Sequence, residues 1–151
     1  MRNTLLVIHI IAVAAWLGAN LTMAFAGSMT RGADVAARRW WAAAQGNLAR
    51  VYKSIAATVV LITGVWLVLL TVEGVRLFEF SDPFVSIGFL VVIVGAGLGI
   101  FVFGPGCRQI VASIDSGDAQ GEARATNRLS VVGLVDTLLV VLAIVAMVGG
   151  W

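Results

Sequence analysis

Four long runs of apolar residues dominate the hydrophobic pattern of this chain. They cover roughly Leu5–Ala26, Ile55–Val72, Phe84–Phe103 and Leu129–Val148. A bilayer core of about 30 Å is crossed by about 20 consecutive apolar residues in a helix, and each run is close to that length. The pattern predicts an all-α, polytopic membrane protein. We expect one domain over residues 1–151, an antiparallel bundle of four transmembrane helices at about 4–26, 53–72, 84–103 and 127–149.

The polar connections carry helix start and stop signals. Asp34 is a suitable N-cap for a helix that starts at Val35, which predicts that the second helix extends beyond the membrane. Pro83 suits the first turn of the third helix. The Gly104-Pro105-Gly106 segment is expected to end that helix.

Composition agrees with a membrane protein that has no separate catalytic domain. Hydrophobic residues make up 60% of the chain and charged residues 12%, whereas soluble proteins carry about 25% charged residues. The net charge of +2 reflects charge in the connections rather than a nucleic-acid partner. Cys107 is the only cysteine, so an intrachain disulfide is excluded.

The basic residues predict an orientation in the membrane. Eight of the ten fall in the first and third connections: Arg31, Arg38, Arg39, Arg50, Lys53, Arg108, Arg124 and Arg128. Arg2 and Arg76 lie on the opposite side. Because basic residues concentrate on the cytoplasmic side, both basic connections are expected inside and both termini outside.

Three glycines of the third helix, Gly88, Gly95 and Gly99, share one face. Small residues let helix backbones approach closely in lipid. The face therefore predicts close packing inside the bundle, and the alternative is a seam between copies of the chain in a homo-oligomer.

A stripe of polar and bulky residues marks the first helix. His9, Trp16, Asn20 and Met23 follow i, i+7, i+11, i+14 spacing, so they lie on one side. Polar groups in hydrocarbon are costly and usually face the bundle interior. His9 is a candidate haem or copper ligand, because a neutral imidazole binds both metals and this is the only histidine. The alternative is a histidine that is hydrogen-bonded between helices.

Asp136 is the acidic residue of the fourth run. Antiparallel first and fourth helices bring Asp136 to the depth of Trp16 and Asn20, and Thr58 and Thr63 bracket the same level on the second helix. Two interpretations stay open. Asp136 is a protonated carboxyl group hydrogen-bonded to one of these residues, because burial disfavours the charged form, or it serves a proton relay or coordinates an ion.

These residues also carry a resemblance to a family. Leu6–Ile11 followed by Trp16–Gly18 resembles the first helix of a bacterial superfamily of four-helix integral membrane proteins. This superfamily includes copper-resistance D-type proteins, HemJ-type protoporphyrinogen oxidases and uncharacterised small members, which are the most similar in size and pattern. Asn47–Arg50 through Ile62–Trp66 resembles their second helix, and Arg128–Val148 resembles their last.

The resemblance implies a bundle in the bacterial cytoplasmic (inner) membrane with His9 facing inward. For HemJ-type members it implies b-type haem held by that histidine. Those proteins also carry a lysine early in the third helix, where this chain has Phe84–Gly88. The resemblance therefore does not extend to the oxidase activity.

Three functional hypotheses follow. In the first, the outer half of the bundle binds b-type haem or a porphyrin through His9, beside Trp16, and Arg2 or Arg76 pairs with propionates. In the second, the protein transports copper or protons with His9, Asn20 and Asp136. In the third, it is a structural or assembly subunit without a ligand, and the polar residues only join helices.

Overall fold

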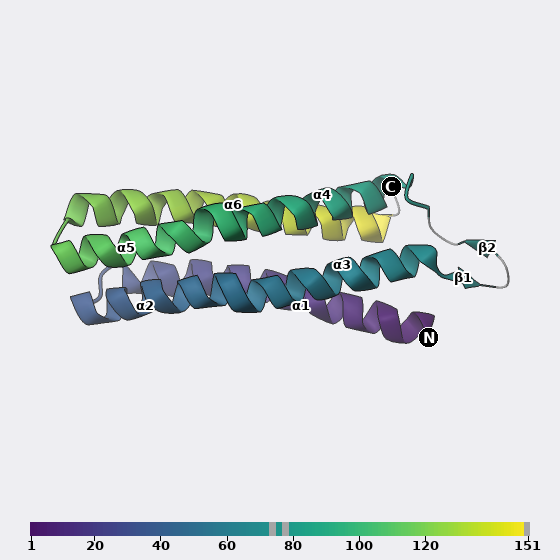
Figure 1. Ribbon diagram of the computed structural model, residues 1–151, viewed down its shortest axis with the longest axis horizontal. Coiled ribbons are helices and arrows are strands. Elements are labelled where there is room, and N and C mark those ends of the chain that lie inside the picture. Colours follow the sequence, from purple (N-terminus) through teal and green to yellow (C-terminus); the bar gives the residue numbers. More distant parts are fainter. Residues whose placement is uncertain (73–74, 77–78, 150–151) are drawn as a thin grey trace.

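A computed structural model describes residues 1–72, 75–76 and 79–149, with the side chains of residues 72, 75 and 76 left out. Within this described part, four helical spans are long and apolar enough to cross a membrane. They are Arg2–Thr30, Val35–Leu69, Pro83–Ser116 and Ala119–Gly149. Figure 1 shows them side by side as an elongated antiparallel bundle. The predicted all-α bundle of membrane-spanning helices is therefore confirmed.

The first and last spans are single helices, whereas each middle span contains a π-helical segment. The elements are α1 (Arg2–Thr30), α2 (Val35–Asn47), η1 (Leu48–Tyr52), α3 (Lys53–Leu69), α4 (Pro83–Leu98), η2 (Gly99–Phe103), α5 (Gly104–Ser116) and α6 (Ala119–Gly149). A short antiparallel pair, β1 (Thr71–Val72) with β2 (Val75–Arg76), follows α3.

The second span starts where its capping signal predicts. The Ala37 amide donates to the Asp34 carboxylate at 2.7 Å, which satisfies one of the free N–H groups of the first turn. The helix then runs without a break through η1 into α3. It ends at Leu69, three residues before the predicted end, because Thr71 and Val72 pair with β2.

The expected end of the third helix at Gly104-Pro105-Gly106 is wrong. The span continues through η2 into α5 and ends at Gly117, whose φ of 72° suits glycine. The π turn in η2 widens the helix just before Pro105, and such turns accommodate local interruptions of the α-helical hydrogen bonds. Gly106 lets α5 approach α6, since a Cβ there would lie 2.7 Å from Leu129 Cδ2.

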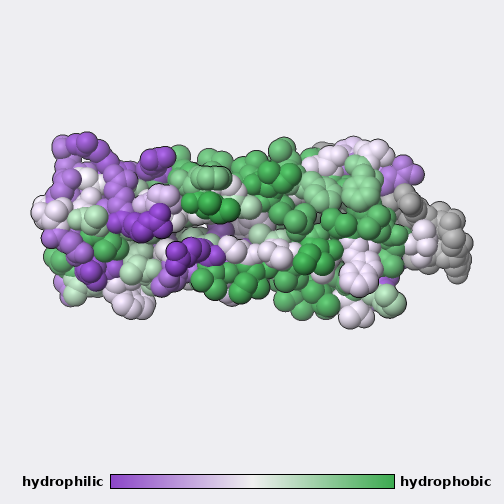
Figure 2. Space-filling model, in the orientation of Figure 1, coloured by the Kyte–Doolittle hydropathy of each residue, from purple (hydrophilic) through white to green (hydrophobic). Residues whose placement is uncertain are grey.

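Figure 1 places the N-terminus, the C-terminal end of α6 and the β1–β2 pair at one end of the bundle. The turns at residues 31–34 and 117–118 form the other end, which we call the polar end. Figure 2 shows hydrophilic residues concentrated over the polar end and a hydrophobic surface over the middle. Large apolar side chains such as Ile11, Phe101 and Leu138 are exposed there. This surface fits contact with the lipid bilayer.

Two apolar core clusters lie one after the other along the bundle. One contains Ala12, Trp16, Ala56, Ala57, Val60, Val91, Val92, Val140 and Ala143. The other, nearer the polar end, contains Met23, Ala42, Ala49, Phe103, Cys107, Ile110, Ile114, Ala125 and Leu129. In the middle of the bundle α1 packs most extensively on α3 and also contacts α6, while α4 packs on α6.

Two of the three glycines of the predicted face are used inside this bundle. A Cβ at Gly88 would lie 2.9 Å from Met147 Cε, and one at Gly95 would lie 2.8 Å from Trp16 Cη2. Gly99 has no neighbour within 4 Å of such a Cβ and belongs to η2. Gly88 and Gly95 therefore serve packing within the chain.

Candidate functional site

A buried ion pair joins the second and fourth spans. Lys53, the first residue of α3, places its Nζ 2.5 Å from Asp136 Oδ2 on α6. The side chains are 4% and 0% exposed. The predicted second helix starts at Lys53, as α3 does, but the expectation that this lysine is one of the charges of the first connection is wrong. The helix is continuous from α2 through η1, so it carries Lys53 into the bundle instead of leaving it in a loop.

Asn20 completes the cluster from α1. Its Nδ2 donates to Asp136 Oδ2 at 2.9 Å, which confirms the expectation that Asp136 lies within hydrogen-bonding reach of Asn20. Both groups that contact Oδ2 are donors, an arrangement that suits an ionised carboxylate acceptor. The Lys53 ammonium also lies 4.6 Å from the centre of the Phe103 ring, a cation–π contact.

The cluster of Asn20, Lys53 and Asp136 lies between the two apolar core clusters. On α1, Trp16 belongs to one core cluster and Met23 to the other, with Asn20 between them. Lys53 likewise lies between Ala49 and Ala56, and Asp136 lies between Leu129 and Val140, one residue of each pair from each core cluster. Desolvation of two charges is costly here, and loss of one partner would leave an uncompensated charge in an apolar environment.

Several polar atoms at this level have no hydrogen-bond partner among the described residues. They are Asp136 Oδ1, Asn20 Oδ1 and Trp16 Nε1. Gly95 brings two of these side chains together, since a Cβ at this position would lie 3.2 Å from Asp136 Oδ1 and 2.8 Å from Trp16 Cη2. Unpaired buried polar atoms are uncommon, so these three atoms set the cluster apart from the apolar packing on either side of it.

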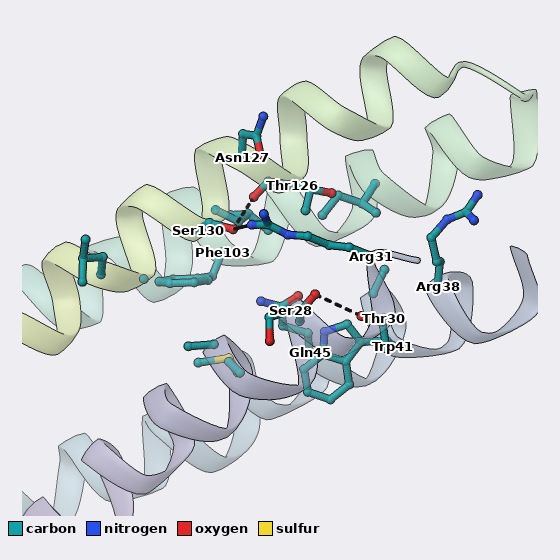
Figure 3. A pocket seen from close by; sticks show the side chains of 18 of the residues that line it. Ser28, Thr30, Arg31, Arg38, Trp41, Gln45, Phe103, Thr126, Asn127 and Ser130 are labelled. Carbon is teal, nitrogen blue, oxygen red and sulfur yellow. Dashed lines mark hydrogen bonds between the residues drawn. The ribbon is translucent and has the colours of Figure 1, made fainter. Parts of the chain in front are cut away.

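A cavity of about 600 Å³ reaches this cluster from the polar end. Asn20 and Phe103 line its deep part, and Arg31, Arg38 and Glu122 line it nearer the turns. Figure 3 shows this cavity between segments of different helices, with Arg31 directed toward Ser130. Arg31 Nη2 donates to Ser130 Oγ at 3.0 Å, and Arg38 Nε pairs with Glu122 at 2.8 Å. We call it the polar-end cavity.

His9 belongs to a different site. Its Nδ1 lies 2.8 Å from Thr63 Oγ1 of α3, so the imidazole joins α1 and α3. The ring lines a second cavity of about 170 Å³ together with Gly64, Gly88 and Met147. The hydrogen-bonded alternative for His9 is therefore borne out by geometry.

The two threonines expected near Asp136 do not lie there. Thr63 contacts His9 instead. Thr58 is exposed, and its hydroxyl donates to the Ser54 carbonyl at 2.8 Å. Lys53 is the α3 residue at the level of Asp136, and Thr58 and Thr63 lie 5 and 10 residues farther along α3, about 7.5 and 15 Å away along the axis. Thr58 also faces away from the bundle.

The remaining expected site residues are spread along the bundle. His9 and Asn20 are 11 residues apart, about 16 Å along the axis of α1. Trp16 lies between them and is buried in the first core cluster. Arg2 is exposed at the start of α1, and the side chain of Arg76 lies outside the described residues. Searched over the described residues, the chain has no group of three or more His, Cys, Asp or Glu side chains that would hold a metal ion.

Lys53 is the site residue that sequence reasoning missed, although a signal was present. Asp34 predicted a helix that starts at Val35, and Lys53 is followed within two residues by the apolar run from Ile55. A helix that is continuous over this stretch places Lys53 on it, 18 residues or about five turns after Val35.

Comparison with models of known protein families, with curated proteins and with solved structures gives no match. The superfamily resemblance therefore stays a prediction from the residues that carry it.

Proposed function

We propose that this multipass membrane protein transfers protons, with Asp136 as the proton-binding group and Lys53 as its charge partner. The observation that carries the proposal is the Lys53–Asp136 ion pair, buried at 4% and 0% exposure between two apolar core clusters. Ionisable residues at this level of a membrane protein are costly and commonly serve proton or ion pathways.

The chemistry of the step follows from the charges. A proton that binds an Asp136 oxygen neutralises the carboxylate, which then no longer balances the Lys53 ammonium. In a medium of low dielectric constant, an uncompensated ammonium either loses its own proton or moves toward water. Proton binding therefore weakens the contact that joins α3 to α6.

Support for the entry route comes from the polar-end cavity. It reaches Asn20, which donates directly to Asp136 Oδ2. Because an amide does not relay a proton, water from the cavity would pass Asn20 and protonate Asp136 Oδ1, the oxygen without a partner among the described residues. On the other side, the first core cluster with Trp16 separates Asp136 from the His9 cavity. Transfer across this barrier requires movement of helices, so we propose transfer coupled to rearrangement rather than a continuous channel.

The test is proton flux in proteoliposomes that enclose a pH-sensitive dye and carry an imposed pH gradient. The wild-type protein should dissipate the gradient faster than protein-free vesicles, and Asp136→Asn should remove this excess. Thr58→Val is the matched control, because Thr58 is exposed on the same span as Lys53 and should leave the flux unchanged.

A folded variant without the charges keeps this test decisive. Lys53→Met/Asp136→Leu replaces the ion pair with apolar side chains of similar size, an exchange that is often neutral or stabilising for a buried pair. It should fold and give no excess flux. Wild-type flux no higher than that of this double variant contradicts the proposal and favours the structural or assembly hypothesis.

Haem or copper binding at His9 is the second candidate. Its support is that His9 lines a cavity, that its Nδ1 is oriented by Thr63, and that its Nε2 is the nitrogen a metal would take. The cavity of about 170 Å³ is smaller than the roughly 300–1,000 Å³ typical of small-molecule sites, so a porphyrin would need the helices around it to separate.

Optical absorbance and metal analysis test the second candidate directly. A Soret band in purified protein supplied with haem, lost in His9→Ala and kept in Thr58→Val, would support haem binding. Stoichiometric copper lost in His9→Ala would support the copper hypothesis. A colourless protein without copper would contradict both.

A further inference from the structure

We propose that the polar-end cavity binds an amphiphilic monoanion, a molecule with one acidic head group on an apolar body. The acidic head would lie at Arg31, and the apolar body would extend toward Phe103 and Asn20. The inference stands apart from proton transfer, because it concerns binding in the cavity and needs no change of charge at Asp136.

The size and walls of the cavity suit such a ligand. A volume of about 600 Å³ lies within the roughly 300–1,000 Å³ of small-molecule sites. Its apolar lining includes the buried side chains of Met23, Phe103 and Leu129 and the exposed side chains of Leu21 and Leu134. These residues come from α1, η2 and α6, so the apolar body would contact side chains of three elements.

The charges around the cavity favour a single negative charge on the ligand. Among the described residues that line it, Arg31 and Arg38 are cations and Glu122 is the anion. Arg38 is paired with Glu122 at 2.8 Å. Arg31 donates to the neutral Ser130 hydroxyl at 3.0 Å through one of its five N–H groups. The lining therefore carries one net positive charge, and a guanidinium binds carboxylate or phosphate groups through paired hydrogen bonds.

Two buried polar atoms in the walls point to a ligand as well. Asn20 is 3% exposed, and its Oδ1 has no hydrogen-bond partner among the described residues. Trp41 Nε1 is buried and also without a partner in that part of the chain. Both residues line the cavity. One atom accepts and the other donates, so a hydroxyl or amide group on the ligand would pair with either of them once its side chain turns toward the cavity.

The experiment measures binding by isothermal titration calorimetry to the full protein in nanodiscs of phosphatidylcholine. Three probes are compared: a medium-chain fatty acid carboxylate, the alcohol of the same chain length, and inorganic phosphate. The carboxylate should bind, and the alcohol should bind at least tenfold more weakly because a charge-assisted hydrogen bond contributes about 1.5–3 kcal/mol.

Variants locate the head group. Arg31→Gln should weaken carboxylate binding about tenfold or more. Arg128→Gln removes the same charge from an exposed residue of α6 that does not line the cavity, and it should leave the affinity unchanged. A hydroxylated fatty acid carboxylate is a fourth probe, used for Trp41→Phe, which keeps an aromatic ring but removes the N–H donor. This variant should weaken binding of the hydroxylated carboxylate more than that of the plain one, and equal weakening would contradict a contact with Trp41.

Competition identifies the source of the ligand. Displacement of the carboxylate by phosphatidylglycerol in the disc supports an anionic membrane lipid, and displacement only by added fatty acid supports a free carboxylate.

Three results overturn the proposal: the alcohol binds as tightly as the carboxylate, inorganic phosphate binds as tightly as the carboxylate, or Arg128→Gln weakens binding as much as Arg31→Gln. Absence of carboxylate binding overturns it as well. None of these outcomes depends on proton flux, so failure here is distinguishable from failure of the proposed function.

Discussion

Gly95 of α4 lies directly against the indole ring of Trp16 on α1. A Cβ added at Gly95 would come within 2.8 Å of Trp16 Cη2, closer than Cβ atoms approach other heavy atoms. It would also lie 3.2 Å from Asp136 Oδ1. The absence of a side chain at residue 95 therefore makes room for the ring that separates the buried ion pair from the His9 site.

The first prediction concerns this close approach. Gly95→Ala should lower the free energy of unfolding by about 1–3 kcal/mol, because the ring must move to admit the methyl group. Gly97→Ala is the matched control on the same helix, since a Cβ there meets nothing within 4 Å. It should be neutral or stabilise the helix by up to about 1 kcal/mol. Unfolding with increasing SDS in mixed micelles measures both, and equal effects would refute the packing argument.

The second prediction concerns the ion pair. Lys53→Met should destabilise the protein by about 3–5 kcal/mol, because it leaves the Asp136 carboxylate without its charge partner. Lys53→Met/Asp136→Leu should recover most of this loss in the same unfolding assay. The exposed pair of Arg39 with Asp115, 2.7 Å apart, serves as the control, and Arg39→Gln should change stability little. A double variant as unstable as Lys53→Met alone would contradict this account.

The third prediction concerns the contact between α1 and α3. Thr63→Val keeps the shape of the side chain but removes the hydroxyl that lies 2.8 Å from His9 Nδ1. It should cost about 1 kcal/mol or more, because a buried imidazole nitrogen loses its partner. Thr58→Val on the exposed face of the same helix should have little effect in the same titration. If the two variants behave alike, the His9–Thr63 contact does not stabilise the fold.

The fourth prediction concerns orientation. Lys53 forms an ion pair with Asp136 inside the bundle, so it no longer counts among the charges of the connections. Seven basic residues remain in the first and third connections, and Arg2 and Arg76 lie on the other side. This asymmetry still predicts that the polar end faces the cytoplasm.

Thiol labelling in a Cys107→Ser background checks this orientation. Ser81→Cys should react with an impermeant maleimide in intact cells, and Gly32→Cys only after permeabilisation. Both positions are exposed and lie at opposite ends of the bundle. The reverse labelling pattern would invert the assignment.

Properties that depend on local sequence were predictable. The length of each apolar run sets the number of spanning helices, and Asp34 sets the start of the second one through a hydrogen bond three residues away. The shared depth of Asn20 and Asp136 followed from the constant rise per residue of antiparallel helices. The first two need only distances along one segment, and the third needs in addition the antiparallel order of α1 and α6.

Only the tertiary structure decided which side chains meet across helices. The offset of α3 relative to α6 along the bundle depends on how the helices pack, so Lys53 lies at Asp136 and Thr63 lies at His9. Rotation about the helix axis leaves Thr58 exposed. The π turns in η1 and η2 add to this uncertainty, since each changes the number of residues per turn and shifts the face that follows. Lys53 directly follows η1, so its approach to Asp136 is set by how two distant helices pack, which no local pattern determines.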